Sequence, residues 1–476
     1  MSSIDILAID RGTVTAPAGC GKTHLIADAL TRHTGSKPIL VLTHTNAGVA
    51  ALRGRLNRAH VPSNAYRLST IDGWAMRIIS TFPARSAINP SILQLQNPGT
   101  DYPAIREAAI NLLRSGNVAD ILIASYSRII VDEYQDCSMR QHAIVTWAAQ
   151  ILPTCVLGDP LQAIFGFGND GLARWNEDVC TYFPIVGELD IPWRWVNANA
   201  EPLGRWLLDA RRTLWEGRPI DLRTAPPESV KWVALDGTED HKRQLIAARV
   251  SPPDGSGCVL IIGESTSPTS QHKIASQTPG AITVEAVDLK DLVSFARQFK
   301  PNKPGALDQL AQFAQSVMTN VGADDLVRRV QSLTHGTARK PPSQVEQLAL
   351  VFLKSQSYRA ALDLLVEINK EGGVRVHRPA VLKACIRALQ LCGEQDAVSF
   401  HDAAIRIREQ SRLIGRPLPK RAVGSTLLLK GLESEVAVIL NADGLNAANL
   451  YVAMTRGSKL LVVCSKSPVL NPNRGR

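Results

Sequence analysis

Residues 15–23 of this chain read TAPAGCGKT, and no other stretch restricts its possible folds as much. An apolar run at residues 6–9 precedes them, and apolar residues at helical spacing follow them from Leu25. Small residues and glycines between a strand and a helix let backbone N–H groups converge on a phosphate at the helix N-terminus. In such a loop Lys22 reaches the terminal phosphates and the Thr23 hydroxyl binds Mg²⁺. The segment alone therefore predicts an α/β nucleoside triphosphatase and nothing more specific.

Net charge, cysteine content and apolar runs indicate the cellular compartment of the protein and the kind of partner it binds. The chain has 476 residues, a formal net charge of +10 and a pI of about 9.3. That charge favours an anionic partner such as nucleic acid, although a general surface surplus explains it equally well. The eight cysteines include no CxxC pair, so we expect small core residues in a reducing compartment. Since the N-terminus is not signal-like and no uncharged apolar run could span a bilayer, we expect a cytoplasmic protein without membrane contact.

Adjacent carboxylates end the next strong apolar run. Residues 129–136 read IIVDEYQD, which is typical of a buried strand followed by acidic side chains. Asp132 could hold a metal ion through water, and Glu133 could polarise the water that attacks a phosphate. The alternative is that these carboxylates belong to a solvent-exposed acidic turn without a catalytic role. The phosphate-binding Lys22 upstream, in a compatible βα frame, favours the catalytic interpretation.

Polar side chains also follow a second run of the predicted first sheet. Residues 38–43 read as a buried parallel strand ending in Thr43, before Thr45 and Asn46 open an alanine-rich helix. Because the carboxyl ends of parallel strands face the ligand crevice of an α/β sheet, these side chains could bind the phosphates or sugars of a nucleic acid. Capping of the helix by Thr45 or Asn46 explains them as well. Both interpretations stay open from the residues alone.

Two later segments carry candidate nucleotide and base contacts. In GDPLQAIFGF, Gln162 could sense a γ-phosphate, with Phe165 and Phe167 in reach of bases. In WRW, Arg194 suits a phosphate clamp and Trp193 suits stacking on a purine. A packed surface cluster explains the WRW triplet equally well.

The second half of the chain predicts another sheet interrupted by helices. Residues 258–263 read as a buried strand, and the Ser/Thr/Pro-rich run 264–279 reads as a loop or linker. From residue 307 to about 412 the composition turns helical, with a capping box at Ser343. The sheet pattern returns at residues 423–440. We therefore expect a helical insertion of about a hundred residues within the second sheet domain.

Taken in order, these segments resemble the UvrD/Rep/PcrA-like family of superfamily 1 DNA helicases. The resemblance rests on a colinear series, because any single segment could arise by chance. The series runs from residue 16 to residue 456 and reads APAGCGKT, THTNAGVAALRGRL, STIDGW, VDEYQD with Gln141 behind it, GDPLQAIFGF, WRW, GSTLLLKGLE and YVAMTR.

The resemblance implies an α/β fold of two RecA-like P-loop domains, with parallel sheets flanked by helices and ATP in the cleft between the domains. It implies a small insertion in the first domain and a helical insertion in the second. The expected boundaries are residues 1–75 and 129–188 for the first RecA-like domain, 76–128 for its small insertion, 189–296 and 413–476 for the second RecA-like domain, and 297–412 for the helical insertion.

The resemblance also implies a role for each matching residue. The nucleotide would be held by Ala16, Gly19, Cys20, Gly21, Lys22, Thr23, Trp193 on the adenine and Glu433 near the ribose. Mg²⁺ would be held by Thr23 and Asp132, and catalysis would use Asp132, Glu133, Gln162 and two arginine fingers, Arg194 and Arg456. Single-strand contacts would come from Thr43, Thr45, Asn46, Thr70, Phe165, Phe167 and Thr426.

We therefore expect an ATP- and Mg²⁺-dependent helicase or translocase that moves 3′ to 5′ on single-stranded DNA, or on a duplex with a single-stranded tail. The implied setting is DNA repair, recombination or genome defence. In the family a glutamine before the loop reads adenine, whereas the residues before Ala16 include no glutamine. Two alternatives stay open: RNA as the strand, and a nucleotide-switched DNA-binding subunit that recruits a nuclease or repair partner through the helical insertion.

Overall fold

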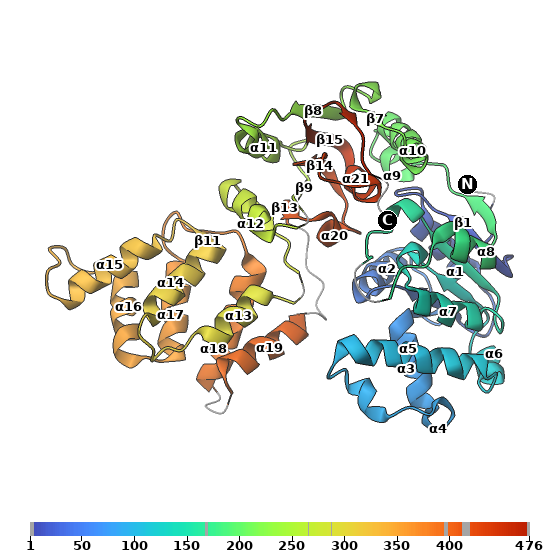
Figure 1. Cartoon of the computed structure of the whole chain (residues 1–476), viewed down its shortest axis with the longest axis horizontal. Coiled ribbons are helices and arrows are strands. Elements are labelled where there is room, and N and C mark those ends of the chain that lie inside the picture. Colours follow the sequence, from blue (N-terminus) through green and yellow to red (C-terminus); the bar gives the residue numbers. More distant parts are fainter. Residues whose placement is uncertain are drawn as a thin grey trace. The chain divides into compact units, whose positions relative to one another are not determined.

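The structure is a computed structural model that describes residues 4–166, 170–264, 266–286, 288–394, 398–411 and 419–473. The chain divides into two compact units. The first comprises Met1–Lys231, Ala442–Leu460 and Ser467–Arg476, and the second comprises Trp232–Asn441 and Leu461–Lys466. Figure 1 labels the helices and strands of both units.

A six-stranded sheet forms the centre of the first unit, in the order β3-β2-β4-β5-β1-β6. Its strands are β1 (Arg11–Thr15), β2 (Ile39–Thr43), β3 (Tyr66–Thr70), β4 (Ile129–Val131), β5 (Thr154–Gly158) and β6 (Ile185–Glu188). Each neighbouring pair runs parallel. Every residue of β2, β4 and β5 is buried, because helices cover both faces of a parallel sheet.

Alternate residues of the central strands face two different cores. Leu40 and Leu42 of β2 pack with α3 (Ile71–Thr81), α5 (Pro98–Arg114) and α7 (Met139–Ala148). Val41 packs on the opposite face with α1 (Lys22–Arg32) and α2 (Asn46–Arg58). The strands run parallel, so the loops after β1, β2, β4 and β5 emerge together at the carboxyl edge of the sheet.

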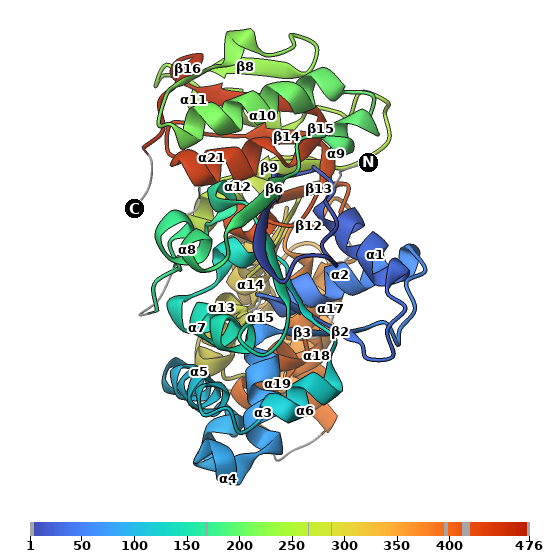
Figure 2. The same ribbon diagram turned by 90° about the vertical axis from the view of Figure 1, so that its right-hand side faces the viewer.

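Helices make up the predicted small insertion at residues 76–128. They are the end of α3, α4 (Pro83–Ser86), the 3₁₀ turn η1 (Pro90–Gln94), α5 and α6 (Ala119–Ser125). Figure 2 shows α3, α4, α5 and α6 gathered together. Arg106 of α5 donates from Nε and Nη2 to the two carboxylate oxygens of Asp72, each at 2.7 Å. This bidentate ion pair ties the insertion to the STIDGW segment.

The remaining elements of the first unit are short apart from one helix. They are η2 (Tyr134–Asp136), η3 (Pro160–Gln162), the π-helical turn η4 (Trp175–Val179), α8 (Cys180–Tyr182), α9 (Trp193–Val196), α10 (Glu201–Trp215), β7 (Ile220–Asp221), η5 (Leu222–Thr224), α21 (Ala447–Met454) and β16 (Val469–Leu470). The unit thus contains residues 189–231 and 442–460, which the sequence assigned to the second RecA-like domain. The predicted domain boundaries stay a prediction.

A second six-stranded sheet has the order β10-β13-β9-β14-β15-β8. Its strands are β8 (Val230–Ala234), β9 (Val259–Ile262), β10 (Ile282–Thr283), β13 (Arg421–Gly424), β14 (Ser434–Ile439) and β15 (Gly457–Ser465). β10, β13, β9 and β14 run parallel. Its short helices are α11 (Asp240–Ala248), α12 (Pro268–Gln277) and α20 (Thr426–Leu429).

Helix α12 corrects one expectation. Residues 264–279 were predicted as a loop or linker from their serine, threonine and proline content. The structure instead places a helix within this run, because Ser267 accepts the backbone N–H of Ser270 and Pro268 occupies the first helical turn. The residues that suggested a linker are the start signals of a helix.

A helical body with its own core completes the second unit. It contains α13 (Lys290–Gln298), α14 (Ala306–Val317), β11 (Met318–Thr319), α15 (Ala323–Thr334), α16 (Gln344–Ser355), α17 (Tyr358–Ile368), β12 (Arg375–Val376), α18 (Pro379–Glu394) and α19 (Phe400–Ser411). The predicted capping box is present, with Ser343 and Glu346 bonded to each other's backbone N–H. The fold class is therefore two RecA-like sheets, one with a small insertion and one with a helical insertion. No helix in the described ranges has both the length and the apolar character needed to cross a membrane.

Candidate nucleotide-binding site

The TAPAGCGKT segment forms a tight loop between β1 and α1. Gly19 and Gly21 have φ angles of 72° and 89°, a left-handed conformation that glycine adopts at little cost. Gly21 caps α1, so no side chain covers the first amides of that helix. Ala16 is 1% exposed, and its N–H donates to Gly158 O at 2.8 Å. The loop therefore has the glycine positions and the open helix N-terminus that a phosphate requires.

The WRW triplet packs directly on this loop. The N–H of Arg194 donates to Gly19 O at 3.0 Å. A Cβ built on Gly19 would lie 2.5 Å from Cζ3 of Trp195, and one built on Gly21 would lie 3.0 Å from Cδ1 of Trp193. Trp195 is buried, whereas Trp193 is 39% exposed. Trp193 is therefore the ring of this pair with a face open to a ligand.

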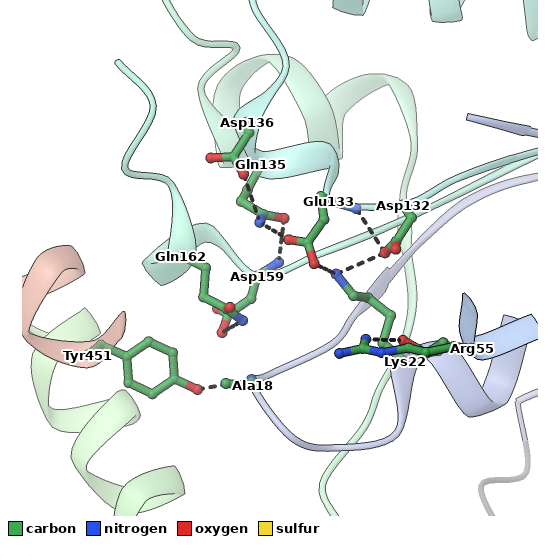
Figure 3. A network of polar contacts seen from close by, with 11 residues as sticks. Ala18, Lys22, Arg55, Asp132, Glu133, Gln135, Asp136, Asp159, Gln162 and Tyr451 are labelled. Atoms are coloured by element: carbon green, nitrogen blue, oxygen red, sulfur yellow. Dashed lines mark hydrogen bonds and ion pairs between the residues drawn. The ribbon is translucent and has the colours of Figure 1, made fainter. Parts of the chain in front are cut away.

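Lys22 meets both predicted carboxylates (Figure 3). Its Nζ lies 2.9 Å from Asp132 Oδ1 and 2.5 Å from Glu133 Oε1. Burial by itself would lower the pKa of Lys22, but the charges of Asp132 and Glu133 outweigh it and raise that pKa above its ordinary value. Lys22 therefore stays a cation at any physiological pH, as phosphate binding requires.

The backbone of Glu133 is held in a strained conformation. Its φ is 56°, a left-handed value that is uncommon for residues other than glycine. The N–H of Glu133 donates to Asp132 Oδ1 at 2.9 Å, and its Oε2 accepts from Gln135 Nε2 at 2.6 Å. Such strain occurs where the surroundings determine a side chain's direction, often at an active site.

A divalent cation fits beside the loop. Thr23 supplies a hydroxyl and Asp132 a carboxylate, the oxygen ligands that Mg²⁺ prefers. Arg55 of α2 donates from Nη1 to Thr23 Oγ1 at 2.9 Å, which leaves the second lone pair of that oxygen for a metal. In the described part of the chain no cluster of three or more His, Cys, Asp or Glu side chains could hold a metal. An ion here would take few protein ligands and complete its shell from water and phosphate, as Mg²⁺ usually does.

Gln162 belongs to a buried polar network behind these carboxylates (Figure 3). Its Nε2 donates to Asp159 Oδ2 at 3.1 Å. The N–H of Asp159 donates to Gln135 Oε1 at 3.1 Å, and Gln135 in turn reaches Glu133. Gln162 and Glu133 are thus joined through two intervening residues.

The two candidate arginine fingers meet at one residue after α21. Nη1 of Arg194 donates to Thr455 O at 2.6 Å, and Nη2 of Arg456 donates to Thr455 Oγ1 at 3.0 Å. Tyr451 of α21 accepts the N–H of Ala18 at 3.2 Å, and burial raises the pKa of its hydroxyl well above the ordinary value. The phosphate loop, the WRW triplet and the YVAMTR segment therefore form one site within the first unit.

Sequence reasoning missed three residues of this site. Arg55 contacts Thr23, Gln135 contacts Glu133, and Tyr451 contacts the loop backbone. Arg55 lay inside the quoted segment THTNAGVAALRGRL, but nothing in the sequence indicated that it would contact Thr23. Gln135 and Tyr451 lay inside recognised motifs, but nothing in the sequence indicated their partners.

The candidate single-strand contacts divide by exposure. Thr45 and Thr70 are the N-caps of α2 and α3, accepting from Gly48 and Gly73 at 3.0 and 2.9 Å. Asn46 is exposed, and the ring of Phe165 lies 5.3 Å from that of His44. Thr43 and Thr426 are each 1% exposed, so their hydroxyls are not at the surface.

Glu433, the candidate ribose contact, is exposed and belongs, like Thr426, to the second unit. Phe167 lies outside the described residues. The roles of all these residues stay predictions.

Comparison with known proteins bears on the family. Residues 93–171 match the model of the UvrD/REP helicase N-terminal domain. No curated protein matches the sequence significantly. Among solved structures the chain is similar to the Arterivirus nonstructural protein 10, a helicase in complex with DNA, at 10% identity and a TM-score of 0.35. That similarity covers 95% of this chain and 60% of the viral chain.

The two parallel sheets and the glycine loop define the class of P-loop nucleoside triphosphatases with RecA-like domains. The matched segment narrows the class, because it includes the strand and the carboxylates of the VDEYQD motif. Within this class, residues 93–171 are similar to the N-terminal domain of UvrD/REP helicases.

Proposed function

We propose that this protein hydrolyses ATP to move along single-stranded DNA in the 3′ to 5′ direction, as a translocase or helicase. The observation that supports it most is the meeting of Lys22 with Asp132 and Glu133 at the carboxyl edge of a parallel sheet. A phosphate-binding cation beside a metal-binding and a water-activating carboxylate is what a Mg²⁺-dependent triphosphatase needs. The family match supports the nucleic-acid part. We further propose a cytoplasmic setting in DNA repair, recombination or genome defence.

Lys22 and the loop amides would bind the terminal phosphates. Lys22 would give up one of its two carboxylate contacts for a phosphate oxygen, which carries comparable charge. Thr23 and Asp132 would hold Mg²⁺, which when bound neutralises charge on the phosphates. Trp193 would stack on the adenine with its exposed face.

Glu133 would take the proton from the attacking water. Its side chain is 33% exposed, so water can reach it, while Lys22 and Gln135 hold its two oxygens. Gln162 would contact the γ-phosphate from the end of the network that begins at Glu133. Arg194 and Arg456 would place positive charge on the transferring phosphoryl group, a role worth several powers of ten in other triphosphatases.

Movement along the strand would follow from alternating grip. The polar groups at the carboxyl ends of β2 and β3, namely Thr43, Thr45, Asn46 and Thr70, would hold one stretch of phosphates, and Thr426 would hold another. Thr43 and Thr426 are each 1% exposed, so a local movement would have to uncover their hydroxyls first. Phe165 would stack on a base, which is sequence-tolerant because every base has a π-face. Thr45 and Thr70 also cap helices, so their hydroxyls would donate to a phosphate oxygen while they accept the capping N–H.

The deciding experiment is ATP turnover by purified protein with and without a single-stranded oligonucleotide. We expect stimulation by DNA, and we expect Lys22→Ala to abolish turnover while sparing strand binding. Lys37→Ala is the matched control, because Lys37 is exposed and its ammonium donates to a backbone carbonyl, Ile123 O, at 2.7 Å. Lack of stimulation in protein with Lys22 intact would refute the proposal. A parallel measurement with RNA of the same sequence decides between the two nucleic acids.

A second measurement tests the arginine assignment. Arg456→Ala should lower kcat far more than it changes the KM for ATP, because the finger acts on charge that develops in the transition state. An equal effect on both constants would instead indicate a role in nucleotide binding.

The rival function is a nucleotide-switched subunit that recruits a separate nuclease or repair partner. One observation favours it: the helical body exposes Val351 and Leu353 of α16, at 52% and 41%. A strand-displacement assay on a tailed duplex separates the two functions. Efficient unwinding by the protein alone would disfavour the switch.

A further inference from the structure

A buried arginine outside every recognised motif contacts the network behind the catalytic carboxylates. Arg211 lies on α10, and its side chain is 11% exposed. Its Nε donates to Asp159 Oδ1 at 3.0 Å, and its Nη1 donates to Glu188 Oε1 at 3.0 Å. Asp159 is fully buried. Leu208, one turn earlier on α10, packs in the same core as Ala16 and Leu25, so the helix that carries Arg211 is fixed against the phosphate loop.

Asp159 uses its remaining hydrogen-bonding capacity on the catalytic segment. Oδ1 also accepts the N–H of Leu161 at 3.2 Å, and Oδ2 accepts Nε2 of Gln162 at 3.1 Å. Its own N–H donates to Oε1 of Gln135 at 3.1 Å. The carboxylate and backbone of Asp159 therefore hold two glutamine amides in place at once.

Gln135 connects this centre to Glu133. Its Nε2 donates to Glu133 Oε2 at 2.6 Å and to Asp136 Oδ2 at 3.4 Å, while its Oε1 accepts from Asp159. With carboxylates on one side and an N–H donor on the other, only one orientation of the amide satisfies all partners. Gln135 is 2% exposed, so water cannot replace these bonds easily. An unbroken series of contacts thus runs from Arg211 through Asp159 and Gln135 to Glu133.

We propose that Arg211 is a positioning residue for hydrolysis, acting through Asp159 to orient Glu133 and Gln162. This inference rests on the proposed ATPase function. Without Arg211, the buried carboxylate of Asp159 loses its counter-charge, and an uncompensated buried charge recruits other donors or shifts toward solvent. Either response moves the amides of Gln135 and Gln162, and with them the carboxylate that activates water. Lysine replaces arginine poorly here, because one ammonium lacks the guanidinium fork that reaches Asp159 and Glu188 together.

The kinetic test compares Arg211→Gln and Arg211→Lys with Arg212→Gln. Arg212 is the matched control, because it is the next residue of the same helix, its side chain is 67% exposed, and it forms an ion pair with the exposed Asp209. We expect Arg211→Gln to lower kcat by about 10- to 100-fold with little change in the KM for ATP, since misplacing a catalytic group affects the chemical step. Arg211→Lys should recover part of that loss. Equal kcat values for Arg211→Gln and Arg212→Gln would overturn the proposal.

A measurement without ATP tests the same network. The folding equilibria of Gln135→Ala, Arg211→Gln and the double variant form a cycle between two residues that share Asp159 but are not bonded to each other. We expect the double variant to depart from the product of the single effects by about fivefold or more in the unfolding equilibrium constant. Independent effects at the two positions would show that Asp159 transmits nothing and would overturn the proposal. If the wild type shows no DNA-stimulated turnover, the proposed function fails, and this cycle still decides whether Arg211 and Gln135 are coupled.

Discussion

Substitution of Gly19 by alanine tests how tightly the aromatic triplet covers the phosphate loop. Gly19 has a φ of 72°, and a Cβ on it would lie 2.5 Å from Trp195 Cζ3 and 3.0 Å from Arg194 Cβ. Gly116 is the matched control, because its backbone conformation is the same and its surroundings are open. Its φ is 73°, and a Cβ there would meet nothing within 4 Å. The two substitutions therefore carry the same backbone penalty and differ only in the steric contact.

The expected magnitudes follow from these two terms. The left-handed conformation costs an alanine about 1–2 kcal/mol, which is the whole of the loss expected for Gly116→Ala. At Gly19 the new methyl group also overpacks a buried indole, which adds about 1–3 kcal/mol. Gly19→Ala should therefore lower the free energy of unfolding by about 2–5 kcal/mol in all.

Urea unfolding followed by tryptophan fluorescence measures these losses. Seven of the eight tryptophans lie between residues 74 and 215, all in the first unit, so the signal reports on the unit that contains both glycines. Adding Trp195→Leu to Gly19→Ala should recover part of the extra loss, because leucine lacks the ring atoms that the methyl group would meet.

Equal losses for Gly19→Ala and Gly116→Ala would refute the argument, since they would mean that Trp195 does not lie on the loop. Additivity of Gly19→Ala and Trp195→Leu would point the same way. Either result would also remove the basis for placing Trp193 beside the adenine.

Three further outcomes are expected. Burial and the nearby Arg378 charge lower the pKa of His377 to about 4, so between pH 6.5 and 4 the unfolded chain binds a proton there that the folded chain does not. The free energy of unfolding should therefore fall as the pH falls through this window. In urea unfolding measured at several pH values, His377→Asn should flatten that part of the profile. Burial raises the pKa of Cys20 to about 12, so alkylation at neutral pH, followed by peptide mass spectrometry, should label the partly exposed Cys258 well before Cys20. Arg106→Gln should cost about 2 kcal/mol in thermal or urea unfolding because it leaves Asp72 without its bidentate partner, whereas the exposed Arg114→Gln on the same helix should cost little.

Much of the first sheet and of the loop could be predicted because their signals are local. An uninterrupted apolar run such as residues 39–42 is sufficient to identify a strand covered on both faces, and its polar end then marks the ligand edge of the sheet. The capping box at Ser343 likewise lies within one helical turn, and the helix begins where that box predicts. Lys22 and Asp132 were expected to meet because both follow parallel strands.

Local signals failed where one residue type serves two structures. Serine and proline start helices as well as break them, so residues 264–279 looked like a linker although Ser267 and Pro268 open α12. For Thr45 the sequence allowed either helix capping or a contact with nucleic acid. The structure shows the capping bond, in which Thr45 Oγ1 accepts the N–H of Gly48, and the contact with nucleic acid stays a prediction.

The sequence by itself determined which residues end the strands, where the glycine loop lies and which side chains are chemically able to bind phosphate and metal. Only the tertiary structure decided which partners those side chains have. Tyr451 reaches the amide of Ala18 across more than four hundred residues, and Arg211 reaches Asp159 from a helix with no motif of its own. Such contacts leave no periodic or local trace, because they depend on how whole elements pack. Adjacent residues in the sequence determine which groups of the loop can bind phosphate. Residues that become neighbours only after folding determine how those groups are oriented.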